Sequence, residues 1–174
     1  DAVKEKLAAW VASNDGADPA AILDKIRYIA GTFLNTARSE AGINTAFSNL
    51  VDIDKNMILN ISASGEDDKQ TATKIRQAIE AEGQITLCRL LGTASLERTE
   101  SRGGYFGGSY RLEHPDQDDE NWLKNIVLKK LNGNIEISHD PVVKLDEDYS
   151  DTMVKAMSTE WATPDDAEYY STSE

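Results

Sequence analysis

Three long stretches of this chain repeat their hydrophobic residues with the period of an α-helix. The first begins at Pro19, which suits a helix's first turn, and runs to Arg38. The second follows Ser39, an N-cap residue type, and the third extends from about Asp67 to Thr99. The apolar positions are Ile22, Ile26, Ile29, Ala30, Phe33 and Leu34 in the first stretch, Ile43, Ala46, Phe47, Leu50 and Val51 in the second, and Ile75, Ala78 and Ile79 in the third.

The third stretch has the features of a central helix. Its segment "ITLCRLLGTASL" is apolar nearly all round, and acids stand at its head, where the helix dipole favours them. Gly83 and Gly92 each cost such a helix about 1 kcal/mol relative to alanine, which a closely packed neighbouring helix can offset. A shorter helix is expected at residues 2–12, before the turn cluster "SNDGADP".

Beyond residue 103 the pattern changes to that of a β-hairpin. Asn132-Gly133 separates two runs of strand-like residues, which is a strong signal for a two-residue turn. Counting outward from this turn pairs Leu131 with Asn134, Lys130 with Ile135, Lys129 with Glu136, and Leu128 with Ile137. The predicted fold is therefore mainly α, a three-helix (spectrin-repeat-like) bundle followed by a small β-hairpin.

Three regions follow from these patterns. Residues 1–103 form the bundle, and residues 104–145 contain a glycine-rich bend, an acidic segment and the hairpin, packed on the bundle. Residues 146–174 form an acidic tail, surface-bound or partly disordered, with one weak amphipathic turn. The apolar residues of that turn are Met153, Val154, Met157 and Trp161.

Composition excludes several classes of protein. A net charge of −13 over 174 residues argues against a nucleic-acid binder, which needs clustered Lys and Arg to neutralise phosphates. No apolar run is long enough for a membrane helix, and the first residues do not resemble a secretory signal. The single Cys88, in an apolar context, indicates an inert buried thiol and fits a reducing compartment. Because the chain begins with Asp1, we expect a processed protein or a piece of a longer polypeptide.

No stretch of the sequence assembles recognisable chemistry. The acids "DQDDE" (116–120) begin like a calcium loop, but Asn121 and Val127 stand where that loop needs Gly and Glu. One acid is instead expected to cap the turn entering "ENWLKN". The segment "GGYFGG" lacks the Lys-Ser/Thr of a phosphate-binding loop. His114 and His139 stand alone, so surface or structural roles are favoured over catalysis. We predict no catalytic, cofactor-binding or metal-binding residue in this chain.

One longer stretch is more specific than its parts. "RTESRG" followed by "YRLEHPDQDDENWLKN" resembles the C-terminal domain of flavoprotein subunits in the succinate dehydrogenase/fumarate reductase family, where a helix ending in ESRG leads to an acid block and a hairpin. The matching residues are Glu100, Ser101, Arg102, Gly103, Tyr110, Arg111, Pro115, Asp118, Asp119, Glu120, Asn121, Trp122, Leu123 and Lys124. A weaker resemblance to the family is found in "RSEAGINTA", from Arg38 to Ala46. The resemblance is good over residues 70–143, loose over 19–60 and nearly absent over 146–174. Aspartate oxidase and adenylylsulfate reductase are relatives.

This sequence departs from the family's pattern at one point. The His that follows "SRG" in the family is replaced by "GYFGGS", which adds about four residues before Tyr110. Any contact made by that His is therefore not expected in this chain. The departure leaves Glu100, Arg102 and the acid block in their family order.

The resemblance implies an accessory domain. The family's FAD-binding domain and catalytic residues precede the C-terminal domain, so FAD belongs to the parent protein and none is expected in this segment. The implied partners are the FAD-binding domain of the same polypeptide and an iron–sulfur subunit, with no nucleic acid and no direct membrane insertion. The implied location is cytoplasmic, peripheral at the inner face of the membrane through partner subunits. The isolated domain is expected to be inactive.

The predicted docking or structural residues surround the bend. They are Glu100, Arg102, Gly103, Tyr110, Arg111, Asp118, Asp119 and Trp122. Arginine and glutamate at the end of the central helix can form charge-assisted hydrogen bonds that fix the bend. A role confined to tying the bundle to its own hairpin is an alternative, and the two roles can coexist. A stand-alone helical-bundle interaction module remains the alternative function.

Overall fold

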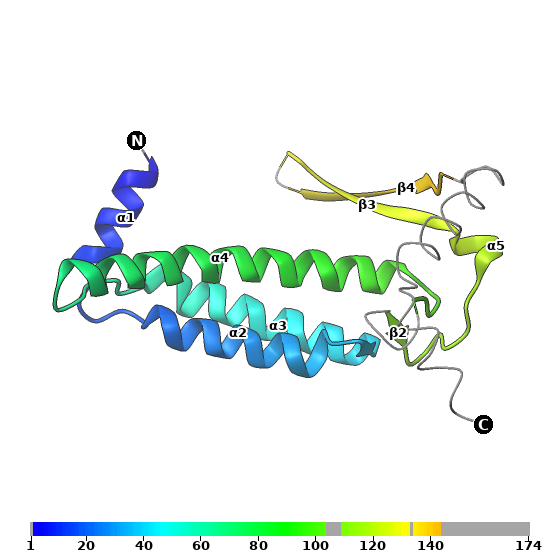
Figure 1. Cartoon of the computed structure of the whole chain (residues 1–174), viewed down its shortest axis with the longest axis horizontal. Coiled ribbons are helices and arrows are strands. Elements are labelled where there is room, and N and C mark those ends of the chain that lie inside the picture. Colours follow the sequence, from blue (N-terminus) through cyan, green and yellow to red (C-terminus); the bar gives the residue numbers. More distant parts are fainter. Residues whose placement is uncertain (1, 104–108, 133, 144–174) are drawn as a thin grey trace, which may run out of the picture. The chain divides into compact units, whose positions relative to one another are not determined.

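The computed structural model of the protein describes residues 2–103, 109–132 and 134–143. The chain divides into two units, residues 1–139 and 140–174, and the second contributes only residues 140–143 to the description. The first unit holds four main helices, α1 (Ala2–Ala12), α2 (Pro19–Phe33), α3 (Glu40–Asn56) and α4 (Asp68–Glu97), with a 3₁₀ turn, η1 (Ile58–Asn60). In Figure 1, α2, α3 and α4 lie side by side, as the predicted three-helix bundle requires.

The helix ends are set by the residues that the pattern indicated. Pro19 occupies the first turn of α2, and the Asp18 carboxylate accepts a hydrogen bond from the amide of Ala21. Ser39 caps α3 by accepting from the amide of Gly42, and Asp67 caps α4 by accepting from the amide of Gln70. The predictions of Pro19 in the first turn of a helix and of Ser39 as an N-cap are therefore confirmed.

The core lies between the helices of the bundle. Its residues come from one face of each helix, and Trp10 of α1 joins them. The most deeply buried apolar side chains are Ile22, Leu23, Ile26, Ile43, Ala46, Leu50, Ile61, Ala63, Ala78 and Ala81. Cys88 is also buried, as predicted, and burial raises the pKa of its thiol, which keeps the thiol protonated and unreactive.

Two sequence-based expectations about the helices are wrong. The first helix stops at Phe33 rather than Arg38, because the Asn35 side chain accepts from the next amide and Ala37–Arg38 form a short strand, β1. The segment "ITLCRLLGTASL" is not buried all round: Leu87 is 66 % exposed, since α2 and α3 cover only one side of α4. Further apolar side chains of the predicted stripes are also exposed, namely Val51, Ile79 and Leu91.

The two glycines of α4 have different surroundings. A Cβ at Gly92 would lie 2.5 Å from Phe47 Cε1 and 3.2 Å from Ile43 Cγ2 of α3, so this glycine permits close helix packing, as expected. A Cβ at Gly83 would meet nothing within 4 Å, so the same expectation is wrong there.

These surroundings predict opposite effects for two alanine substitutions. Gly83→Ala should stabilise the fold by about 1 kcal/mol, because alanine is the better helix former and meets no obstacle. Gly92→Ala should destabilise it by about 1 to 2 kcal/mol, because the buried Ile43 and the Phe47 ring must shift. Urea unfolding of both variants, followed by circular dichroism, tests this pair. Equal effects at the two positions would contradict the packing difference.

The hairpin is present with the predicted turn. Strands β3 (Lys124–Leu131) and β4 (Asn134–Pro141) form a two-stranded sheet. Asn132 has φ 52°, the left-handed conformation that a two-residue hairpin turn needs at its first central position. The residue-by-residue pairing stays a prediction. The predicted tail, with its amphipathic turn around Met157, lies outside the described residues. So do residues 104–108 of the glycine-rich segment.

Among the described residues, no helix is both long and apolar enough to cross a membrane.

Candidate functional site

The segment that follows α4 folds back onto the end of α2. Strand β2 (Tyr110–Arg111) pairs in parallel with β1 (Ala37–Arg38). The amide of Tyr110 donates to the Thr36 carbonyl at 2.9 Å, and the amide of Leu112 donates to the Arg38 carbonyl at 2.9 Å. Just before β2, Arg102 and Ser109 form an isolated antiparallel β-bridge. Neither short strand was predicted, because two residues carry no periodicity.

Glu100 is the centre of the bend after α4. Its side chain is 0 % exposed, yet each carboxylate oxygen accepts hydrogen bonds. Arg102 donates from Nε to Oε1 at 2.7 Å and from Nη2 to Oε2 at 3.0 Å, which is a bidentate pair. Arg98 donates to Oε1 at 2.5 Å, and the Asp118 amide donates to Oε2 at 2.8 Å. The predicted arginine–glutamate bonds at this bend are therefore confirmed.

These contacts determine the ionisation of the pair. Burial by itself raises the pKa of Glu100, but the hydrogen bonds from Arg102, from the Asp118 amide and from Arg98 outweigh it. The pKa of Glu100 consequently lies below its ordinary value. The hydrogen bonds to Glu100 and Asp119 raise the pKa of Arg102. Both groups are charged at neutral pH, so the bend is held by a buried ion pair.

Arg111 caps the end of α4 from inside the fold. Its side chain is only 1 % exposed. Its Nη1 donates to the Ser95 carbonyl and, at 2.9 Å, to the Arg98 carbonyl, two groups of the last helical turn that lack helical partners. A cation at this helix end is also favoured by the helix dipole. Its Nε is buried without a hydrogen-bond partner among the described residues.

Arg38 caps the C-terminal end of α2, as Arg111 caps that of α4. Its Nε donates to the Leu34 carbonyl at 3.1 Å, and its Nη1 donates to the hydroxyls of Ser95 and Ser109 at 2.9 and 3.0 Å. Burial and then the nearby charge of Arg111 lower the pKa of Arg38. The two arginines thus lie close together at two helix C-termini, which relieve part of their mutual repulsion.

Glu113 supplies an anion at the same end of the bundle. Its Oε1 accepts from the amide of Glu40 at 2.9 Å, at the start of α3, and its Oε2 lies 3.6 Å from Arg111 Nη2. The hydrogen bond from the Glu40 amide lowers the pKa of Glu113 against the effect of burial. Glu113 is therefore an anion at the N-terminus of α3, beside the Arg111 cation at the C-terminus of α4.

The acid block, residues 116–120, contacts the bend through Asp118 and Asp119. Asp118 caps α5 (Asp119–Trp122) by accepting from the Asn121 amide at 3.0 Å, which confirms the predicted capping acid. Asp119 accepts from Arg102 Nη2 at 2.7 Å and from Gln117 Nε2 at 2.9 Å. The hydrogen bonds from Gln117 and then Arg102 lower the pKa of Asp119, so it is ionised.

Trp122 anchors the acid block to the end of α4. Its indole Nε1 donates to the Thr99 hydroxyl at 2.9 Å, and its carbonyl accepts from Arg98 Nη1 at 3.1 Å. The Arg98 guanidinium and the Lys124 ammonium lie over its ring. His139 of β4 meets the same ring edge-on and lies 3.1 Å from Glu97. These contacts tie the hairpin to the bundle.

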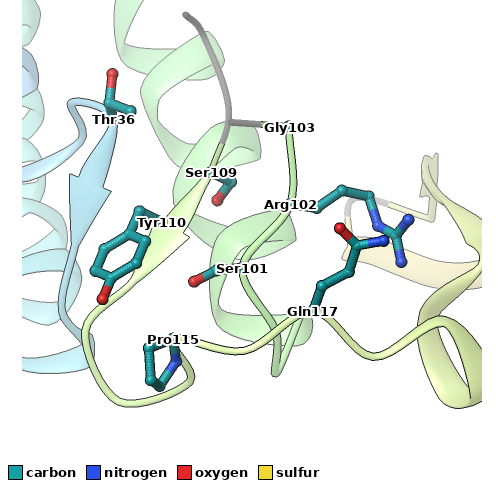
Figure 2. Close-up of a pocket in the computed structure, with 8 residues that line it drawn as sticks. All are labelled: Thr36, Ser101, Arg102, Gly103, Ser109, Tyr110, Pro115 and Gln117. Carbon is teal, nitrogen blue, oxygen red and sulfur yellow. The ribbon is translucent and has the colours of Figure 1, made fainter. Parts of the chain in front are cut away.

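A pocket of about 700 Å³ opens beside this bend. Figure 2 shows its lining, with Tyr110 and Pro115 on one side and the Arg102 and Gln117 side chains on the other. Thr36, Ser101, Gly103 and Ser109 complete the lining. Gly103 has φ 93°, a conformation that favours glycine. The walls are held by Ser101, whose hydroxyl donates to the His114 carbonyl at 2.7 Å and accepts from the Arg111 amide at 2.8 Å.

The structure brings the eight predicted residues to one region around the bend. Three of them, Arg102, Gly103 and Tyr110, line the pocket, while Glu100 and Arg111 are buried beneath it. Asp118 is the N-cap of α5, and Asp119 and Trp122 are its first and last residues. Their docking role stays a prediction. Sequence reasoning missed Arg98, which bonds Glu100, Trp122 and Lys124, although its position two residues before Glu100 was a usable signal.

The groups around the bend determine what this site can bind. Within residues 2–103, 109–132 and 134–143, no group of three His, Cys, Asp or Glu could hold a metal ion. The serine and threonine hydroxyls that line the pocket and the arginines of the site take part in hydrogen bonds within the domain. What the site presents outward is a partly apolar pocket next to several carboxylates.

Comparison with known proteins adds a family. The family model described as "Fumarate reductase flavoprotein C-term" matches residues 25–162 of the chain. No curated protein matches the sequence.

Solved structures show a similar fold. E. coli quinol fumarate reductase FrdA, in a mutated form, superimposes with a TM-score of 0.68 at 16 % identity, over 83 % of this chain and 24 % of that one. The Mycobacterium smegmatis Sdh1 complex superimposes with a TM-score of 0.68 at 20 % identity, over 94 % of this chain and 27 % of that one, in its apo form and in complex with UQ1. The chain therefore spans about a quarter of the length of the structures that it resembles.

Proposed function

Because the chain belongs to the fumarate reductase flavoprotein C-terminal family, we propose that it is the non-catalytic accessory domain of an FAD-dependent succinate dehydrogenase/fumarate reductase-type oxidoreductase. Its role is to pack on the FAD-binding domain of the same polypeptide and, in the assembled enzyme, to adjoin an iron–sulfur partner subunit. The parent reaction is hydride transfer between the flavin and a dicarboxylate, with FAD supplying the electron chemistry.

The observation that carries this proposal is the extent of the family match. It covers residues 25–162, so it includes the helices α3 and α4, the bend and the hairpin rather than a short motif. The buried Glu100 pair supports a structural role, since its hydrogen-bonding groups are directed into the fold and not toward a substrate. The proposed location follows from the role, at the inner face of the membrane through partner subunits.

The proposal predicts that the isolated 174-residue chain binds no flavin and turns over no substrate. The chain should be purified, mixed with excess FAD, passed through a desalting column, and scanned for the flavin absorbance bands. Fumarate reduction and succinate oxidation should then be assayed with artificial electron carriers. We expect a colourless, inactive protein. A yellow protein that retains FAD, or measurable turnover, would overturn the accessory role.

The encoding gene separates this proposal from the stand-alone interaction module. An open reading frame that continues upstream with a dinucleotide-binding fingerprint supports the accessory domain. A start codon beside Asp1 supports the module.

A further inference from the structure

We propose that the pocket beside β2 receives a basic segment of the FAD-binding part of the same polypeptide. In this arrangement the aliphatic stem of a lysine or arginine enters the pocket, and its charge meets carboxylates at the pocket's edge. The inference rests on the proposed function for the identity of the partner. It adds the place of contact and the chemistry of the contacting segment.

Exposed apolar surface surrounds the pocket. Tyr110 lines the pocket and is 44 % exposed, and the neighbouring Leu112 is 57 % exposed. Pro115, which lies on the same side of the pocket as Tyr110 in Figure 2, is exposed as well. A side chain with a long hydrocarbon stem would cover this surface, and the volume of about 700 Å³ leaves room for it.

The segment that contains the lining residues Pro115 and Gln117 is rich in exposed acids. We define the acidic rim as four exposed carboxylates of this segment, Glu113, Asp116, Asp119 and Glu120. Asp116 lies between two lining residues, and Asp119 is bonded to the lining residues Arg102 and Gln117. The carboxylates of Asp116 and Glu120 take part in no hydrogen bond or ion pair within the described residues. These two are therefore available to a partner.

The nearby arginines do not cancel this negative surface. Arg111 is buried and Arg38 half-buried, and both donate to helix-end carbonyls. Arg102 faces the pocket, but its guanidinium is engaged by Glu100 and Asp119. The cations are thus satisfied inside the domain, while the carboxylates of Asp116 and Glu120 are exposed and unpaired within the described residues. A cationic partner matches this surface and an anionic one is repelled by it.

The first test is carbodiimide cross-linking of the full-length flavoprotein, because this reagent joins carboxylates directly to lysines. Mass spectrometry is expected to find links from Asp116 or Glu120 to lysines of the FAD-binding part. The Asp116→Asn/Glu120→Gln variant should lose those links and keep others.

The second test detects arginine as well as lysine. Amide exchange of residues 109–117 is measured by mass spectrometry in the full-length protein and in the charge-reversal variant Asp116→Lys/Glu120→Lys. We expect exchange to become about tenfold faster in that variant, because repulsion opens the contact. The matched control, Asp15→Lys/Glu66→Lys, makes the same change of charge at two exposed acids, one in the connection between α1 and α2 and one just before α4 begins. It should leave exchange at residues 109–117 unchanged.

The outcomes separate the inference from the proposed function. Links between the FAD-binding part and other faces of this domain, with no rim links and no effect of charge reversal, would overturn the inference and preserve the accessory role. Absence of any link to the FAD-binding part, again with no effect of charge reversal, would overturn both. Circular dichroism of each variant shows that its helices are intact, so that faster exchange is read as undocking and not as unfolding.

Discussion

Replacing Glu100 with alanine is expected to destabilise the domain by about 3 kcal/mol, the low end for breaking a buried ion pair. The substitution leaves the Asp118 amide without its acceptor and removes the carboxylate shared by Arg98 and Arg102. The loss stays near the low end because Arg102 keeps Asp119 and Arg98 keeps two carbonyls. Urea unfolding at neutral pH measures the change.

The stabilisation by Glu100 also depends on pH in a defined direction. Its pKa in the folded protein lies below the ordinary value of 4.5, so the folded state favours the charged form. The contribution is therefore complete at neutral pH and is lost as the pH falls below 4.5 and through the folded pKa. In Glu100→Ala the unfolding free energy should fall less steeply over this acid range than in the unaltered chain.

A matched control is available in the acid block. Glu120 is exposed, so Glu120→Ala should change the unfolding free energy by no more than about 0.5 kcal/mol. Similar losses for Glu100→Ala and Glu120→Ala would show that the buried ion pair does not hold the bend.

Replacing Arg111 with alanine is expected to cost about 3 kcal/mol for a different reason. The substitution leaves a cavity under the bend and deprives the Ser95 and Arg98 carbonyls of their donor. Arg111→Met should cost about 1 to 2 kcal/mol less than Arg111→Ala, because methionine fills much of the space that alanine leaves empty, whereas both substitutions remove the buried, unpartnered Nε. Thermal and urea unfolding of both variants measure the difference. If methionine were as damaging as alanine, the lost donors to the Ser95 and Arg98 carbonyls would outweigh the filled volume.

Some contacts at the bend were predictable from the sequence and others were not, for a physical reason. Glu100 and Arg102 are two residues apart at a helix end, so their attraction was predictable from spacing and charge. Arg38 and Arg111 are 73 positions apart in sequence, and nothing local connects them. Their meeting depends on the β1–β2 pairing, which consists of two residues in each strand. Short strands of this kind leave no periodic signal.

Which residues of α4 are exposed could not be predicted from the sequence either. A helix that is apolar nearly all round is usually central, but burial depends on how many neighbours the fold provides. Here α2 and α3 pack on one side, so Ile85 is buried and Leu87 is exposed. The difference between Gly83 and Gly92 has the same origin, because the sequence cannot tell which glycine faces Phe47.

By itself, the sequence determined the helical bundle, the helix starts at Pro19 and after Ser39, the hairpin turn at Asn132, and the family, because these depend on periodicity, backbone preference and motif order within short stretches. Only the tertiary structure decided where α2 ends, which side of α4 is covered, how Arg38 and Arg111 share two helix ends, and that a pocket opens beside an acidic rim. These features arise from contacts between residues far apart in the chain, whose partners are selected by packing and by the need to satisfy buried charges.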